Sequence, residues 1–163
     1  MLAREMLIKE FEYNHWANGR LLDQVEKVTE EQWAAKADPD GRSLGELLYH
    51  LFSLERVWRL LSAHGLIQEG ELPEAEDLAN AEALREFSDN EAEFMSILLE
   101  DWSDDSFDEE VLVTNWDGTT SPLVRWHMLR HLLTHSTVHR SEAAGLLTEM
   151  GYSPGDIDFI FFI

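Results

Sequence analysis

The chain has 163 residues, 44% of them hydrophobic, which is enough to bury a core as a single domain spanning 1–163. Its net charge of −21, with only 12 Lys and Arg, disfavours binding to nucleic acid or to an anionic membrane, because both need clustered positive charge. No cysteine is present, which excludes disulfides, a thiolate nucleophile and sulfur ligands. Any bound metal must therefore be held by histidine, carboxylate and water.

The sequence contains no signal for membrane insertion or secretion. No run of about 18 uninterrupted apolar residues occurs, so no transmembrane helix is predicted. The opening MLAREMLIKEFEYNHW lacks the basic flank, long apolar stretch and small-residue cleavage site of a secretory signal. We therefore expect a cytoplasmic protein.

The first expected element is a long amphipathic helix at residues 2–28, because its apolar side chains recur every three or four residues. Asn14 and Asn18 interrupt the apolar stripe, and we expect them in polar contacts within the fold or in a cavity wall. Thr29 begins the sequence Thr-Glu-Glu-Gln, which resembles a capping box and predicts a short helical segment. Residues 37–42, Ala-Asp-Pro-Asp-Gly-Arg, predict a loop.

Two further long helices are expected in the middle of the chain. Ser43 with Glu46 forms a second capping box and opens a helix whose inward stripe includes His50. The polar, acidic residues 65–77 predict a long crossover loop. The next helix is expected at residues 80–102. Its expected buried face comprises Leu84, Phe87, Phe94, Leu98 and Trp102.

A turn and a helix start are predicted before the last element. Residues 107–113, followed by Asn-Trp-Asp-Gly at 115–118, predict a short β-hairpin. Ser121 as N-cap and Pro122 as first helical residue predict a helix that continues to Met150. The expected fold is all-α, a four-helix bundle with a long crossover loop and a short β-hairpin before the last helix.

The last expected helix carries histidine at every fourth position. These residues are His127, His131, His135 and His139. An i,i+4 pair places two imidazoles on one face, about 6 Å apart along the axis, which is close enough to chelate one ion. Each step of four also turns about 40° around the axis, so only one adjacent pair can share an ion. The spacing alone does not say which pair binds.

A third ligand must come from another helix, and His50 is the candidate. Three histidine ligands with an open position are typical of catalytic metal sites. Two simpler interpretations compete: His50 as a core histidine bonded to a neighbour, and the other histidines as a partly exposed helix face. An inward histidine facing an i,i+4 pair in a cysteine-free bundle favours the metal site.

Other metal patterns are weaker. Glu12-Tyr-Asn-His15 is a Glu-x-x-His sequence, but di-iron bundles need two such motifs and two further carboxylates. No His-Glu-x-x-His and no Gly-rich phosphate loop is present. His15 and His64 have no partner at ligand spacing, so we expect them in packing contacts or at the surface.

Three blocks of the sequence carry a family resemblance. They read His-Leu-Leu-Thr-His-Ser-Thr-Val-His-Arg-Ser-Glu-Ala-Ala at 131–144, Tyr-Asn-His-Trp-Ala-Asn at 13–18 and Leu-Leu-Tyr-His-Leu at 47–51. In composition, order and spacing they resemble the DinB-like family of metal-binding four-helix bundles, which is related to bacillithiol and mycothiol S-transferase-like proteins. The resemblance covers nearly the whole chain.

The resemblance implies that His50, His135 and His139 hold a divalent metal ion, with zinc or nickel expected. His131 would then lie next to the ligands or line the cavity. A homodimer is also implied, because members of the family are described as dimers. Several relatives transfer a low-molecular-weight thiol to a small electrophile, which implies a small-molecule substrate here.

The chain departs from the family pattern at Val138, where a second histidine is frequent, and at residues 141–142, where Gly-Gln is frequent. These departures leave the three histidines intact and leave the substrate open. Glu142, three residues after His139, is the candidate carboxylate or base next to the ligands, and a simple surface charge is the alternative.

Together these features predict a metal-dependent enzyme of the thiol S-transferase or hydrolase type that acts on a small molecule. The ion would act as a Lewis acid and lower the pKa of a bound water or incoming thiol. Since the chain has no cysteine, the thiol must come from solution. The alternative is a non-enzymatic dimeric bundle in which the metal is structural or sensory. The apolar tail at 158–163 is expected to pack on the bundle or to enter a subunit interface.

Overall fold

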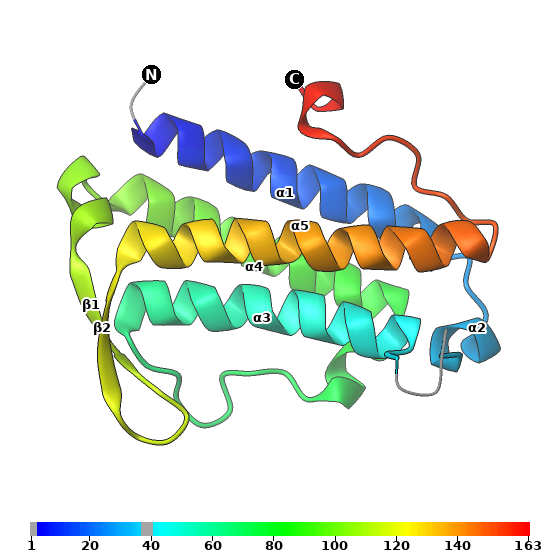
Figure 1. Cartoon of the computed structure of the whole chain (residues 1–163), viewed down its shortest axis with the longest axis horizontal. Coiled ribbons are helices and arrows are strands. Elements are labelled where there is room, and N and C mark those ends of the chain that lie inside the picture. Colours follow the sequence, from blue (N-terminus) through cyan, green and yellow to red (C-terminus); the bar gives the residue numbers. More distant parts are fainter. Residues whose placement is uncertain (1–2, 37–40) are drawn as a thin grey trace.

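The computed structural model describes residues 3–36 and 41–163 and has the expected four-helix bundle architecture (Figure 1). The long helices are α1 (Ala3–Val25), α3 (Leu44–His64), α4 (Ala81–Asp101) and α5 (Arg125–Glu149). Helix α3 packs beside α5 and α1 packs beside α4, while contacts of α1 with α5 and of α3 with α4 close the bundle. Residues 37–40 of the expected loop lie outside the described residues.

Both predicted capping boxes are present. Thr29 Oγ1 accepts a hydrogen bond from the Gln32 backbone N–H at 3.2 Å and opens α2 (Glu30–Ala34). Ser43 Oγ accepts from the Glu46 N–H at 3.1 Å, and Glu46 Oε2 accepts from the Ser43 N–H at 2.7 Å. These bonds satisfy backbone donors that have no partner inside the helix, so the start of α3 is fixed locally.

Two glycines shape the ends of α3. Gly45 allows the indole of Trp33 on α2 to lie directly against the helix, because a Cβ at this position would collide with that ring. Gly65 caps the C-terminus with φ 72°, a left-handed conformation that favours glycine. A Cβ at Gly65 would also collide with the carbonyl oxygen of Leu112. The crossover that follows contains the 3₁₀ turn η1 (Ala75–Leu78) before α4 begins.

The expected buried face of α4 is partly wrong, because Phe94 is 49% exposed. Glu91 is buried instead, since Arg59 Nε and Arg56 Nε each lie 2.6 Å from its carboxylate oxygens. Hydrophobic spacing cannot assign a buried position to a carboxylate whose partners come from another helix. The buried residues of α4 are Leu84, Phe87, Ser88, Glu91, Met95 and Leu99.

The predicted hairpin is present as the antiparallel strands β1 (Glu110–Thr114) and β2 (Thr120–Val124). The 3₁₀ turn η2 (Asp104–Asp108) joins it to α4. The prediction that Ser121-Pro122 opens the last helix is wrong, because both residues lie in β2 and Pro122 is paired with Leu112. Each strand of a two-stranded ribbon has a free edge, where a residue without an N–H is tolerated.

Helix α5 begins instead at Arg125 and has no side-chain N-cap. The Arg125 backbone N–H donates to the carbonyl of Glu109 at 3.0 Å. Its guanidinium donates to the carbonyl of Ser62 on α3 at 2.9 Å and to the carbonyl of Ser106. The start of α5 is therefore set by contacts distant in sequence, which a local pattern does not reveal.

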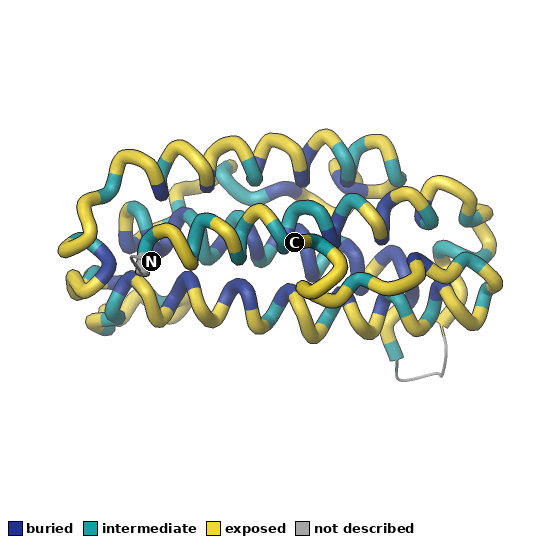
Figure 2. The backbone as a smooth tube through the Cα atoms, turned by 90° about the horizontal axis from the view of Figure 1, so that it is seen from above, coloured by how far each residue is buried: buried dark blue, intermediate teal, exposed yellow. Residues whose placement is uncertain are grey.

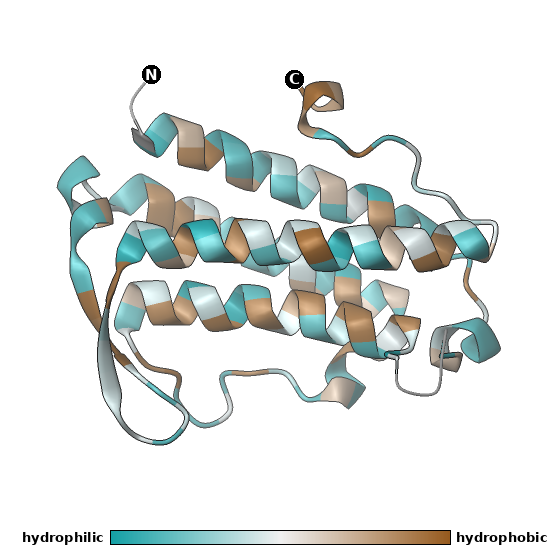
Figure 3. Cartoon of the chain, viewed as in Figure 1, coloured by the Kyte–Doolittle hydropathy of each residue, from teal (hydrophilic) through white to brown (hydrophobic). Residues whose placement is uncertain are grey.

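Buried residues line the inner sides of the helices, and exposed residues face outward (Figure 2). Colouring by hydropathy shows hydrophobic residues recurring along the long helices, with the strongly hydrophobic C-terminal turn lying beside α1 (Figure 3). The largest cluster joins α1, α3, α4 and α5 around Leu21, Leu48, Phe52, Leu84 and Leu147. No helix within the described residues is long and apolar enough to cross a membrane.

The C-terminal tail packs on α1, which is one of the two alternatives predicted for it from the sequence. The Tyr13 hydroxyl donates to the carbonyl of Ile157 at 2.9 Å. The ring of Phe159 lies 5.2 Å from that of Tyr13, in the 3₁₀ turn η3 (Phe159–Phe161). The ring of Phe162 lies 5.7 Å from that of Trp16. The tail still leaves apolar side chains on the surface.

Candidate metal centre

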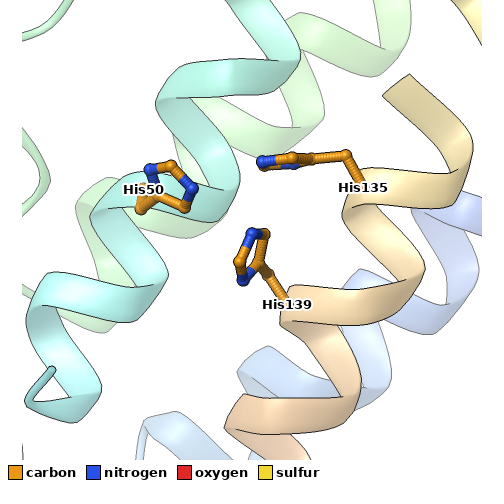
Figure 4. A group of neighbouring side chains, drawn as sticks. All are labelled: His50, His135 and His139. Carbon is orange, nitrogen blue, oxygen red and sulfur yellow. The ribbon is translucent and has the colours of Figure 1, made fainter. Parts of the chain in front are cut away.

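Three histidines from two neighbouring helices converge in the structure (Figure 4). His50 lies on α3, and His135 and His139 lie on α5. One potential ligand nitrogen from each residue lies within 4.8 Å of the other two. The ring centroids are 5.0 Å apart for His50 and His135, 4.6 Å for His50 and His139, and 4.3 Å for His135 and His139.

This donor set fits a divalent transition-metal ion. A tetrahedral ion holds imidazole nitrogens at about 2.0–2.1 Å, which places each pair of nitrogens roughly 3.4 Å apart. The observed separations are within reach of small side-chain rotations. All three residues are partly buried.

The structure also separates the histidines of α5 that the spacing left equivalent. The ring of His131 lies 4.5 Å from that of Trp58 and 5.8 Å from that of His135, outside the converging group. The ring of His127 packs on Trp126 at 4.1 Å. Among the described residues, the last i,i+4 pair is the one that faces the histidine of α3.

Electrostatics keep two of the rings neutral. Burial, followed by the proximity of His139, His50 and His131, lowers the pKa of His135 to about 4. Burial also lowers the pKa of His50, and the positive charge of Arg42 adds to this effect. Neutral imidazole is the form that binds a metal ion. The ring nitrogens of both residues are also free of protein hydrogen bonds within the described ranges, so their lone pairs are available.

Glu142 lies against the third ring of the group. Its Oε2 is 2.6 Å from His139 Nδ1, while its side chain is otherwise exposed. When Nδ1–H donates to this carboxylate, Nε2 keeps the lone pair that a metal needs, and the ring orientation is held. Glu142 thus contacts a candidate ligand rather than joining the group itself.

A buried polar network lies next to this group, and its acidic member was not singled out in the sequence. Glu55 Oε1 accepts hydrogen bonds from Asn14 Nδ2 at 2.8 Å, Asn18 Nδ2 at 3.0 Å and Ser136 Oγ at 2.9 Å. Arg140, 1% exposed, donates to Asn14 Oδ1 at 2.7 Å and to Asn18 Oδ1 at 3.0 Å. In the sequence, this network is indicated by Asn14 and Asn18, two asparagines spaced i,i+4 on an otherwise apolar stripe, whose side chains need polar partners such as Glu55 and Arg140.

The remaining sequence candidates lie elsewhere. His15 Nε2 is 3.6 Å from Asp89 Oδ1. His64 is the exposed last residue of α3. Glu12 forms an ion pair with Lys9 at 3.0 Å. Within the described ranges, the Glu-x-x-His sequence is not part of any second group of three converging ligands.

These features define a four-helix bundle with a three-histidine group between α3 and α5. The sequence model of the DinB family matches residues 2–163, and the chain belongs to this family. Protein DinB of Bacillus subtilis (strain 168) is 20% identical over 159 residues, covering 95% of this chain and 92% of that protein.

Solved structures give the same result for the fold. A DinB-like protein from Bacillus subtilis matches with a TM-score of 0.70 at 15% identity, covering 91% of this chain and 94% of that one. A DinB-like protein from Bacillus cereus matches with a TM-score of 0.65 at 22% identity, covering 93% and 95%. At these identities the similarity establishes the architecture and does not transfer a reaction.

Proposed function

We propose that this DinB family member is a divalent-metal-dependent enzyme of the thiol S-transferase or hydrolase type, acting on a small molecule. The observation that carries the proposal is the convergence of three imidazoles, joined by no fourth protein ligand in the part of the chain that the structure describes. Three protein ligands and one open position are the arrangement of catalytic rather than structural zinc sites. Zinc or nickel is the proposed ion, since imidazole suits both.

Each residue has a distinct role in this proposal. His50, His135 and His139 would hold the ion, which would supply a Lewis acid that makes a water or thiol easier to deprotonate. Glu142 orients His139 through Nδ1. We propose the same carboxylate as the general base of the reaction. The thiol of a transferase reaction comes from solution, because the chain has no cysteine.

Metal analysis by mass spectrometry tests the site. Untagged protein, purified without chelator or metal resin, is compared with a His50→Ala, His135→Ala double variant. We expect one ion per chain in the native protein and none in the variant. The matched control is His127→Ala, His131→Ala, which removes an i,i+4 pair from the same helix outside the group and should keep the ion. Native protein that neither contains nor takes up an ion would contradict the proposal.

A second experiment separates the enzyme from a structural or sensory metal site. Protein loaded with Co²⁺ is titrated with low-molecular-weight thiols, and the visible absorption is followed. An open position predicts a new sulfur-to-cobalt band, together with thiol transfer to a model electrophile such as monochlorobimane. A spectrum that no thiol changes, with no metal-dependent turnover, would favour the non-enzymatic alternative.

A homodimer is part of the same proposal. The tail keeps Ile160, Phe161 and Ile163 exposed by 66%, 57% and 68%, which supports a surface that a second copy covers. Light scattering after gel filtration should give twice the chain mass, and Ile160→Asp, Phe161→Asp should give a monomer. A monomeric native protein would contradict this part.

A further inference from the structure

A cavity lies on the other side of the bundle from the three histidines, between α1 and α4. Its volume is about 240 Å³, and it shares no lining residue with the histidine group. Phe11, Met95 and Leu132 supply apolar wall, while Asn14 and Glu55 supply polar wall from α1 and α3. The cavity therefore has the apolar lining and the few placed polar groups that are typical of a small-molecule site.

Glu55 is the polar group that gives this cavity its chemistry. Its side chain is buried, with 8% of the residue exposed. All three hydrogen bonds to its carboxylate end on Oε1, from Asn14, Asn18 and Ser136. Its Oε2 has no hydrogen-bond partner within the described ranges, and the residue lines the cavity. A carboxylate oxygen that is largely shielded from bulk water forms its strongest hydrogen bond with a charged donor.

The other charges in the wall leave the cavity negative. Arg59 is a cation that lines the cavity, but its guanidinium already donates two hydrogen bonds to Glu91, at 2.6 and 3.2 Å. Glu91 is in turn paired with Arg56 as well. His15 also lines the cavity, and its Nδ1 is buried without a hydrogen-bond partner in the described part of the chain. The wall thus carries four carboxylates, those of Glu12, Glu55, Glu91 and Glu100, against the one guanidinium of Arg59. Arg140, the buried cation of the Glu55 network, donates to Asn14 Oδ1 and Asn18 Oδ1, so Glu55 keeps its Oε2 toward the cavity.

We propose that this cavity binds a small primary amine in its ammonium form. The ammonium group donates to Glu55 Oε2, and a short apolar body packs against Phe11, Met95 and Leu132. An ammonium group is a compact cation with three donors, so it supplies the charge and the hydrogen bond that the carboxylate lacks. A neutral ligand of the same shape supplies neither charge nor an equally strong bond.

Binding is tested with n-butylammonium and benzylammonium chloride, and n-butanol serves as the neutral control. Each ligand is titrated into the full chain and followed by heteronuclear NMR, once after treatment with a chelator and once after loading with zinc. We expect saturable binding of the amines with the same affinity in both preparations, with shifts at Ala92 and Met95. Binding that requires the ion would be ligation at the histidines and would overturn the proposal.

Two variants test the position of the ligand. Glu55→Gln keeps an acceptor for Asn14, Asn18 and Ser136 but removes the charge, and we expect amine binding to weaken by at least about tenfold. Ala92→Phe fills the cavity from α4 and should abolish binding, while Ile97→Phe, exposed on the same helix, should not. Unfolding curves confirm that each variant is folded. Native affinity in either Glu55→Gln or Ala92→Phe would overturn the proposal.

Because this cavity and the histidine group share no residue, the two proposals fail separately. Loss of the ion in the His50→Ala, His135→Ala variant should leave amine binding unchanged.

Discussion

Helix α5 carries two polar i,i+4 pairs that are one residue apart and have opposite surroundings. Ser136 and Arg140 are 0% and 1% exposed and belong to the buried network of Glu55. His135 and His139 precede each of them by one residue and lie partly exposed, facing His50 on α3. One residue corresponds to a rotation of about 100° around the helix axis. The same i,i+4 spacing therefore places one pair in the core and the next pair on the partly exposed face toward α3.

The two pairs differ in whether the protein itself satisfies their polar atoms. The side chains of Ser136 and Arg140 donate to oxygens of Glu55, Asn14 and Asn18, so the network is complete within the fold at this end. The histidines instead bring their ring nitrogens close together. Two nitrogens that both donate, or both accept, cannot form a hydrogen bond with each other. A satisfied buried pair stabilises the fold, whereas converging unsatisfied nitrogens indicate a ligand.

The largest expected effect is on stability, at the buried pair. Arg140→Met should lower the free energy of unfolding of the metal-free protein by about 3 kcal/mol, because it leaves the Asn14 and Asn18 oxygens and the Glu55 charge without their buried cation. Urea unfolding measures the change. Ser141→Ala, at an exposed neighbour, should cost less than about 0.5 kcal/mol. Equal effects of the two changes would mean that the network does not stabilise the fold.

The histidine pair should show the opposite behaviour. His135→Ala should change the stability of the metal-free protein by less than about 1 kcal/mol, since the ring makes no hydrogen bond with any residue that the structure describes and packs only against the other rings. Zinc at about 100 times its dissociation constant should stabilise the native chain by about 2.7 kcal/mol and the variant not at all. Parallel urea titrations with and without zinc measure both. Stabilisation of the variant by zinc would place the ion elsewhere.

A smaller effect is expected from the carboxylate that holds His139. Glu142→Gln should weaken ion binding by roughly 10-fold, because the ring loses its charged acceptor at Nδ1. Competition with a chromophoric chelator gives the affinity. Glu149→Gln, an exposed carboxylate at the end of the same helix, should leave it unchanged. Equal losses in both variants would point to net charge rather than to the contact with His139.

The last prediction concerns the pH dependence of the metal-free protein. Burial lowers the pKa of His135 to about 4, below the value of 6.5 that it has when unfolded, so the unfolded chain binds more protons between these values. The contribution is therefore complete above pH 6.5 and is lost as the pH falls toward 4. His50 acts in the same direction. Urea midpoints should fall less steeply with acid in His135→Ala, and identical slopes would contradict the shift.

Prediction from the sequence failed where distant contacts override a local pattern. Phe94 fits the hydrophobic spacing of α4, yet Glu91 is buried because two arginines of α3 neutralise it. Ser121-Pro122 has the chemistry of a helix start, yet strand pairing with β1 delays α5 to Arg125. Both errors come from partners that lie eight or more residues away along the chain.

The sequence by itself determined the helices, their capping boxes and the candidate ligand residues, because these depend on spacing and on side-chain chemistry within a few residues. The spacing left open which of the α5 histidine pairs faces His50, and the family resemblance implied His135 and His139. The tertiary structure shows this pair facing His50, because the outcome depends on the rotation of α5 against α3. Packing of the helices also decided that Glu55 is buried with one oxygen toward a cavity. Periodicity specifies the face of one helix, and only contact between helices specifies what that face meets.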